Sequence, residues 1–179
     1  MKFTPTKIAG VWLIEMERYE DERGWFARSW CAEEFAARGL NPRLSQCSVS
    51  FNKKKGTLRG MHWQAAPHEE AKLVRCTRGA IYDVALDVRP SSATFKQWVG
   101  VELTQENGYA LYVPEGFAHG FQTLANDTEV FYQISESHHS EFSGGARWDD
   151  PAFGIQWPLP EPILSERDWN YVDFKKSQI

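Results

Sequence analysis

The sequence lacks several features that would place it in other classes of protein. No apolar run approaches the roughly 18–20 residues that a membrane-spanning helix needs. The first residues, MKFTPTKIAGVW, lack the basic, apolar and small-residue order of a secretory signal. We therefore expect a cytoplasmic protein with no membrane partner. The three cysteines, Cys31, Cys47 and Cys76, fit neither a disulfide framework nor a zinc motif, so we expect reduced thiols.

An excess of charge of one sign is also missing. The formal net charge is -4, and no dense stripe of Lys and Arg occurs. Because phosphate contacts supply most of the affinity for nucleic acids, this composition argues against a nucleic-acid partner. The KKK run at 53–55 is a local patch, which we expect to be a solvated hairpin turn. With no internal repeat, low-complexity stretch or linker, residues 1–179 are expected to form a single domain.

What the sequence does contain is a series of short segments rich in Val, Ile, Tyr and Phe. They are separated by Gly, Pro, Asn and Asp, a pattern typical of an antiparallel sandwich or barrel. One short helix is expected within 29–39, where two glutamates come early and Gly39 can end it. The proline-punctuated tail from residue 151 is expected to wrap the barrel rather than join its sheet. The clearest expected strands are 72–79, 80–89, 96–103, 109–116, 119–126 and 129–137.

The expected strand 80–89 alternates strictly, so its side chains divide between two faces. One face must pack on a core, and it carries Tyr82, Val84, Leu86 and Val88. The other face carries Ile81, Asp83, Ala85 and Asp87, and we expect it to present its two carboxylates elsewhere.

Two of the five histidines lie in contexts that single them out. His62 belongs to LRGMHWQ. His119 ends the pattern Pro114-x-Gly116-x-x-His119, a turn that many cupins use to place a histidine inside the barrel mouth. The other three are interpreted as solvated loop residues, namely His68, His138 and His139.

These histidines favour acid–base chemistry over metal binding. A metal-binding cupin would also need a His-x-His pair and an upstream glutamate, whereas the upstream region offers only His62. Without a metal, an interior histidine acts as an acid or base and needs a carboxylate to fix its tautomer. Candidate partners are Asp83, Asp87 and Asp168. The alternative is a buried histidine that is satisfied by one hydrogen bond and has no catalytic role.

Other polar residues are weaker candidates by themselves. Lys72 begins an expected strand and could stabilise an enolate, or it could simply protect a strand edge. Arg23 and Arg59 could clamp a diphosphate by charge-assisted hydrogen bonds, although exposed arginines are usually solvated. Tyr132 shares a strand face with apolar neighbours, so a core tyrosine is its alternative interpretation.

Seven strings taken together resemble the dTDP-4-dehydrorhamnose 3,5-epimerase family, and they cover nearly the whole chain in order. They are DERGWF, LRGMHWQ, KLVRCTRGAIYDVALDVRPSS, LYVPEGFAHGFQTL, VFYQIS, WDDPAFGIQWP and LSERD. The resemblance implies an all-β fold, a double-stranded β-helix or cupin-like jelly-roll barrel with a few short helices. It also implies a homodimer that binds a nucleoside diphosphate 4-keto sugar and uses neither a cofactor nor a metal.

The resemblance also implies a role for each matching residue. His62 would be the base that removes the proton beside the ketone, with Asp168 as its partner. Tyr132 would return a proton from the other face, and Lys72 would hold the ketone oxygen. The implied substrate-binding residues, with two arginines for the diphosphate and a glutamine for the nucleotide, are Arg23, Phe26, Gln46, Arg59, Asp83, His119 and Arg167.

Three positions depart from the family pattern, namely Arg28, Ser48 and Ser143. They belong to substrate binding rather than proton transfer, so they leave open the nucleotide, the sugar, and whether C3, C5 or both are inverted. A single-centre epimerase or ketoisomerase therefore stays an alternative. Two alternatives of other classes are a catalytically silent cupin that binds a sugar nucleotide and a metal-dependent cupin oxygenase.

Overall fold

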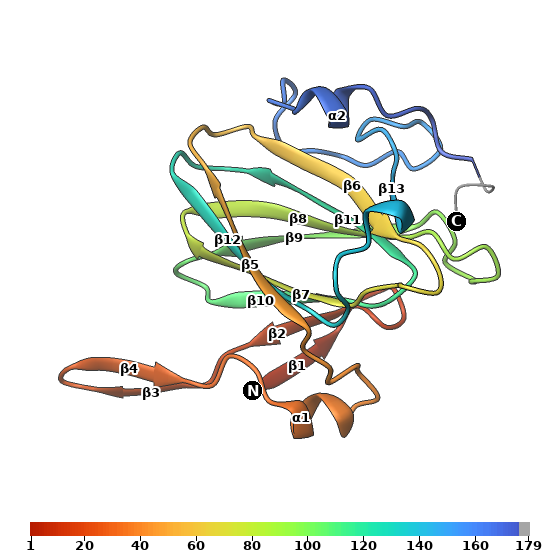
Figure 1. Ribbon diagram of the computed structural model, residues 1–179. Coiled ribbons are helices and arrows are strands. Elements are labelled where there is room, and N and C mark those ends of the chain that lie inside the picture. The colour runs from red at the N-terminus through yellow and green to blue at the C-terminus, as the bar shows by residue number, and fades with distance from the viewer. Residues whose placement is uncertain (176–179) are drawn as a thin grey trace.

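Two antiparallel sheets face each other in the computed structural model, which describes residues 1–175 (Figure 1). The all-β class predicted from the sequence is confirmed. The last four residues of the predicted 1–179 domain lie outside the described part of the chain. In that part, no helix is long and apolar enough to cross a membrane.

The first sheet has six strands, in the spatial order β1 (Lys2–Pro5), β2 (Trp12–Glu15), β10 (Tyr109–Val113), β7 (Lys72–Arg78), β12 (Thr128–Ile134) and β5 (Gln46–Asn52). The second has five, in the order β13 (Ser143–Gly145), β6 (Leu58–Gln64), β11 (Phe117–Thr123), β8 (Ala80–Asp87) and β9 (Trp98–Thr104). A separate hairpin projects from one end of the barrel (Figure 1), formed by β3 (Arg18–Asp21) and β4 (Gly24–Ala27). The helical elements are α1 (Ala32–Ala36), the 3₁₀ turn η1 (Ser140–Phe142) and α2 (Glu166–Trp169).

The six expected strands correspond to β7 through β12, with small differences at their ends. The expected helix is also present, although α1 is only five residues long. The strands that the sequence pattern did not reveal include β1 to β4, each of four residues. Such segments are too short to display a period of two, and pairing with neighbouring strands defines them instead.

Apolar side chains pack on both faces of each sheet, which differs from the expectation for 80–89. Ile81 and Ala85 lie in the core between the two sheets. Val84 and Leu86 lie in a second cluster on the outer face of the second sheet, where Phe153 of the tail covers them. The face that carries Asp83 is therefore the barrel interior, not a surface.

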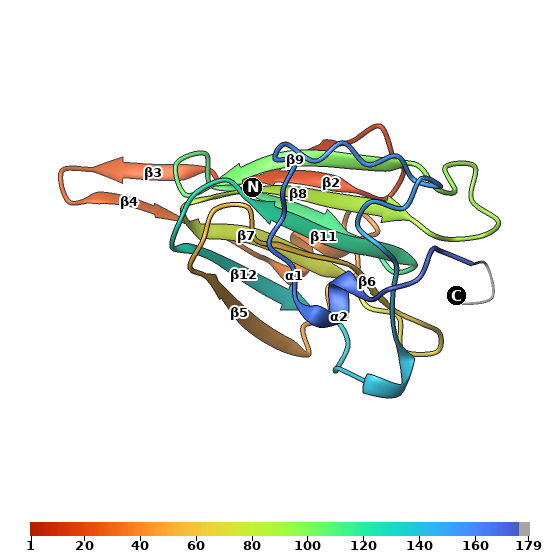
Figure 2. The same ribbon diagram turned by 90° about the horizontal axis from the view of Figure 1, so that it is seen from above.

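The C-terminal tail wraps the barrel, as predicted. Within its described residues, 151–175, it forms no strand and joins a sheet only through a parallel bridge between Thr57 and Ile163. It crosses above the second sheet in both views, so that α2 lies over β6 (Figures 1 and 2). This path brings the distant segment that contains Asp168 to the barrel.

The basic run 53–55 is an exposed turn, but the prediction of a hairpin is wrong. It joins β5, which pairs with β12 in the first sheet, to β6, which pairs with β11 in the second sheet. The turn therefore carries the chain from one sheet to the other.

Candidate active site

A cavity of about 430 Å³ opens between the two sheets at the side that α2 covers. Its volume lies in the range that suits a small organic ligand. Eight of the predicted site residues line it: Gln46, Arg59, His62, Lys72, His119, Tyr132, Arg167 and Asp168. Residues from β5, β6, β7, β11, β12 and the tail thus converge on one place.

His62 and Asp168 form a hydrogen-bonded pair in this cavity. The His62 Nε2 atom lies 2.6 Å from Oδ1 of Asp168, and the His62 side chain is 35% exposed. Ser165 caps α2 by accepting a hydrogen bond from the backbone N–H of Asp168, at 3.1 Å. Burial by itself would raise the pKa of Asp168, but the hydrogen bond and charge of His62 outweigh it, so the pKa lies below its ordinary value. The carboxylate is thus held ionised beside the imidazole.

A second histidine–aspartate pair lies deeper in the barrel. His119 Nε2 is 2.8 Å from Oδ1 of Asp83, and the two side chains are 6% and 0% exposed. Oδ2 of Asp83 is buried and has no hydrogen-bond partner among the described residues. His119 and His62 are opposite each other in the pairing of β11 with β6, which brings both rings to the cavity.

Two glycines permit this close pairing of β6 and β11. Gly60 has a φ of +132°, and a Cβ there would lie 2.6 Å from the Cα of Gly120. A Cβ on Gly120 would in turn lie 2.9 Å from the Arg59 carbonyl oxygen. Any larger residue would push the strands apart. The glycines next to Arg59 and His119 in the two motifs therefore set the spacing of the histidines.

Tyr132 enters the cavity from the opposite sheet. It lies on β12, and its ring meets that of His119 edge to face, with centroids 5.9 Å apart. Burial raises the pKa of Tyr132 well above its ordinary value, and the charge of Asp83 raises it further, while Arg59 opposes the shift. The phenol is consequently a protonated donor at neutral pH.

Lys72 and Glu70 add a second pair of opposite charges. The Lys72 Nζ atom lies 2.9 Å from Oε1 of Glu70, and both side chains are largely buried. Both residues line the cavity. Glu70 could not be predicted as a site residue, because a glutamate in the polar stretch before a strand carries no signal of its own.

Two other residues that line the cavity were not among the predicted site residues. Ser165 begins the pattern Ser-x-x-Asp, a recognisable capping sequence that could have predicted its contact with Asp168. His138, interpreted as a solvated loop residue, is exposed but lines the cavity. Its backbone N–H donates to the side chain of Gln46 at 3.2 Å.

Arg23 and Phe26 lie away from the cavity of their own chain. Both are on the projecting hairpin, where the Arg23 side chain is 85% exposed and pairs with Asp21, and Phe26 is 76% exposed. Of the three departures from the family pattern, Ser48 and Ser143 line the cavity. Arg28 instead pairs with Glu34 at 3.2 Å.

Comparison with known proteins identifies the family. The family model described as dTDP-4-dehydrorhamnose 3,5-epimerase matches residues 5–176. The protein of that name from Sinorhizobium fredii (strain NBRC 101917 / NGR234) is 45% identical over 169 residues, which cover 94% of this chain and 87% of the relative.

Solved structures agree with this match. The Elizabethkingia anophelis NUHP1 dTDP-4-dehydrorhamnose 3,5-epimerase is 38% identical, with a TM-score of 0.96 over 100% of this chain and 99% of that one. The Legionella pneumophila Philadelphia 1 dTDP-6-deoxy-D-glucose-3,5-epimerase, solved with dTDP-4-keto-L-rhamnose, is 37% identical, with a TM-score of 0.90 over 96% and 92% of the two chains. The predicted cupin-like barrel is thereby confirmed, and the chain belongs to the dTDP-4-dehydrorhamnose 3,5-epimerase family.

Proposed function

We propose that this chain is an isomerase that inverts C3 and C5 of a dTDP-linked 4-keto-6-deoxy sugar. The observation that carries the proposal is the position of the two proton-transfer groups. His62, backed by Asp168, comes from the second sheet, and Tyr132 comes from the first sheet, and all three line one cavity. A base and an acid on opposite sides of a bound ring are what inversion of a carbon centre requires.

His62 is assigned as the base. A carboxylate accepts hydrogen bonds, so the Nε2 atom next to Asp168 carries the proton and Nδ1 keeps its lone pair. A ketone at C4 acidifies the hydrogens on C3 and C5, and Nδ1 removes one of them. Asp168 stabilises the imidazolium that this step creates.

Lys72 is assigned to the ketone oxygen. Removal of the proton places negative charge on that oxygen as the enolate forms, and an ammonium group in a shielded cavity stabilises it. Glu70, 2.9 Å away, fixes the position of the ammonium group. Tyr132 then donates its proton to the opposite face of the carbon. His62 loses its proton to solvent and Tyr132 regains one, so the site is restored, and no cofactor is needed.

The test is incubation with dTDP-4-keto-6-deoxyglucose in deuterium oxide, followed by proton NMR. Deuterium at both C3 and C5 is expected. Deuterium at only one of them would make the protein a single-centre epimerase, as Ser48 and Ser143 in the cavity leave open. No exchange with this substrate or with its CDP and GDP analogues would remove the enzyme proposal in favour of a silent binding protein.

Tyr132→Phe separates the two proton transfers in the same assay. The variant keeps His62, so exchange is expected to continue while inversion falls by about 10²-fold or more. If exchange falls more than inversion does, the roles of His62 and Tyr132 are reversed.

We further propose that the protein is a homodimer in which each hairpin completes the partner's cavity. The hairpin exposes three aromatic side chains, Tyr19, Trp25 and Phe26, and joins neither large sheet. β5 is an edge strand of the first sheet as described, and its exposed Val49 and Phe51 alternate along the strand with the cavity-lining Ser48 and Ser50. An exposed strand edge and a projecting hairpin suit strand addition between two copies. Arg23 and Phe26, which the resemblance implies as substrate-binding residues, would then contact the substrate in the partner's cavity.

Mixing two inactive variants tests this arrangement. His62→Ala destroys the base, and Arg23→Ala combined with Phe26→Ala destroys the hairpin contacts. A mixed dimer then holds one cavity with an intact base and an intact hairpin, so a 1:1 mixture that has re-equilibrated should regain about a quarter of wild-type activity. No recovery, in mixtures that mass photometry shows to be dimeric, would mean that the hairpin does not serve the partner's cavity. The cytoplasmic location expected from the sequence stays a prediction.

A further inference from the structure

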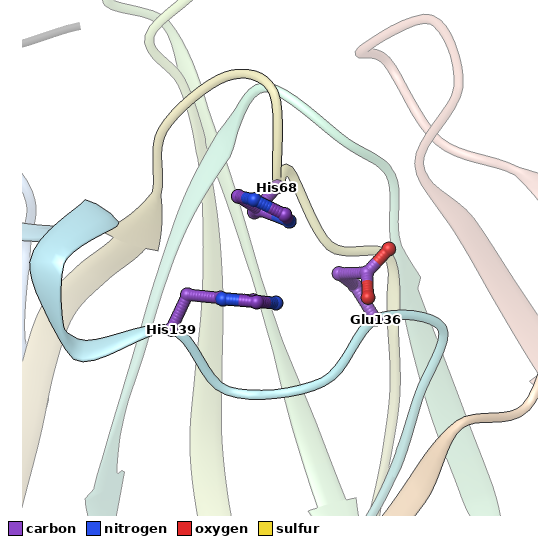
Figure 3. Close-up of side chains that lie close together, drawn as sticks. All are labelled: His68, Glu136 and His139. Atoms are coloured by element: carbon purple, nitrogen blue, oxygen red, sulfur yellow. The ribbon is translucent and has the colours of Figure 1, made fainter.

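The structure brings together two histidines and a glutamate that the proposed reaction does not use. His68 and His139 stack with ring centroids 3.7 Å apart and an angle of 22° between their planes, and Phe142 packs against His68 at 4.8 Å. One ligand atom from each of His68, His139 and Glu136 lies within 4.8 Å of the others. Figure 3 shows the two rings one above the other with the carboxylate beside them. The sequence predicts both histidines only as solvated loop residues, and it gives no sign of this contact.

These side chains come from two loops that leave the barrel side by side. His68 lies between β6 and β7, and the other two follow β12. Because β7 and β12 are paired, Ala71 and Ser135 form two hydrogen bonds at the point where the loops leave the sheet. The backbone N–H of Ser135 donates to the carbonyl oxygen of Ala71 at 3.0 Å, and the backbone N–H of Ala71 donates to the Ser135 hydroxyl at 2.8 Å. The cluster therefore depends on tertiary pairing and not on any sequence motif.

A buried glutamine holds the two loops in place. The amide nitrogen of Gln64 donates to the backbone oxygens of His68, at 2.5 Å, and Ser137, at 3.0 Å. Its amide oxygen accepts the backbone N–H of His139, at 2.7 Å. The backbones of both histidines are thus fixed before any ligand arrives, which lowers the entropic cost of binding.

The outer contacts suit metal ligation. His139 Nδ1 lies 3.7 Å from Oε1 of Glu141, so a carboxylate lies near the imidazole on the side of this nitrogen, within reach of a small side-chain movement. The backbone N–H of Ser137 donates to Glu136, and Arg43 lies 3.0 Å from its Oε2 atom. Each of these contacts uses one lone pair of the oxygen that it meets, so both carboxylate oxygens keep further lone pairs.

We propose that His68, His139 and Glu136 bind one Zn²⁺ ion, with water as the fourth ligand, and that the ion clips the two loops together. Two imidazoles and a carboxylate are a donor set that zinc accepts. Zinc–ligand bonds of about 2.0–2.1 Å require donor atoms roughly 3.3–3.4 Å apart, so the side chains contract slightly and the stacked rings turn until their nitrogens meet the ion. The two loops also carry Glu70 and His138, which line the cavity, so the ion would stiffen its rim.

Zinc titration of the untagged, full-length protein tests the site, using ZnCl₂ and isothermal titration calorimetry. One ion per chain is expected. His68→Ala and His139→Ala should each weaken binding by about 100-fold or more, and Glu136→Gln by about tenfold. The matched control is His138→Ala, which changes the adjacent histidine outside the cluster. Its affinity for zinc should stay within about twofold of the wild-type affinity.

A second control excludes the cavity histidines as the zinc site. His62→Ala should keep zinc affinity, and loss of binding in that variant with retention in His68→Ala would overturn the proposal. Binding no tighter in wild type than in a His68→Ala/His139→Ala double variant would also overturn it. Circular dichroism and thermal melting without zinc verify that each variant is folded, and His68→Gln replaces His68→Ala if the latter is not.

In the wild-type protein, zinc should raise the melting temperature and slow amide hydrogen exchange in both loops.

Discussion

Two histidine–aspartate pairs each supply a histidine to the cavity; their hydrogen bonds have nearly equal lengths and their surroundings differ. The hydrogen bond of His62 to Asp168 is 2.6 Å long, and that of His119 to Asp83 is 2.8 Å. The first histidine is partly exposed and its aspartate comes from the tail, whereas both members of the second pair are buried on adjacent strands. A base must exchange its proton with solvent after each turnover, and the partly exposed His62 meets this requirement better than the buried His119. Accessibility, more than pairing, is therefore what supports His62 as the proposed base.

Replacing each histidine by asparagine should give the largest difference in activity between the two pairs. His62→Asn removes the base, so kcat for epimerisation should fall by about 10³–10⁴-fold. His119→Asn keeps a hydrogen-bond donor near Asp83 and should cost about 10–100-fold, equivalent to roughly 1–3 kcal/mol of lost positioning. Steady-state measurements of kcat for the two folded variants test which histidine is the base. Equal losses, or the reverse order, would show that the buried pair performs the proton transfer.

Amide substitution of the two aspartates should have the next largest effect. Asp168→Asn keeps the shape of the side chain but no longer stabilises the imidazolium or fixes its tautomer. We expect kcat to fall by about 10³-fold, with KM changed much less. A variant that keeps at least a tenth of wild-type kcat would contradict the assignment of Asp168 as the partner of the base.

Asp83→Asn should instead change the pH dependence. Burial first, and then the negative charge of Asp83, raise the pKa of Tyr132. Removing that charge lowers the pKa of Tyr132, so the phenol loses its proton at a lower pH. The basic limb of the kcat–pH profile should therefore move to lower pH, while Asp168→Asn leaves that limb in place. A shift to higher pH would contradict Tyr132 as the acid.

The smallest expected effect concerns the cap that supports the more accessible pair. Ser165→Ala removes the acceptor for the backbone N–H of Asp168 and should destabilise α2 by about 1 kcal/mol. If the same free energy is lost in positioning the Asp168 carboxylate beside His62, kcat falls by about fivefold. Ser140→Ala, at an exposed serine far from this contact, is the matched control. Thermal melting and kcat measured together distinguish this local effect from general unfolding.

Much of the fold could be predicted because the strands from β7 to β12 are long enough to display their alternation. The segment 80–89 is an example, yet its pattern could not reveal that both faces are buried, since a carboxylate such as Asp83 carries no signal of burial by itself. The turn 53–55 was wrongly expected to close a hairpin, because local composition marks a turn but not which sheet each flanking strand joins.

The sequence by itself determined the family, the all-β class and, through the resemblance, eight of the residues that line the cavity, because these depend on residue types in a fixed order. The resemblance also implied that Asp168 is the partner of His62, but only the tertiary structure brings them together, since the two residues are 106 positions apart and meet only when the tail crosses the second sheet. The tertiary structure also decided that Arg23 and Phe26 point away from their own cavity and that His68 stacks on His139. Such contacts arise from strand pairing between distant segments, and no local pattern of residues encodes them.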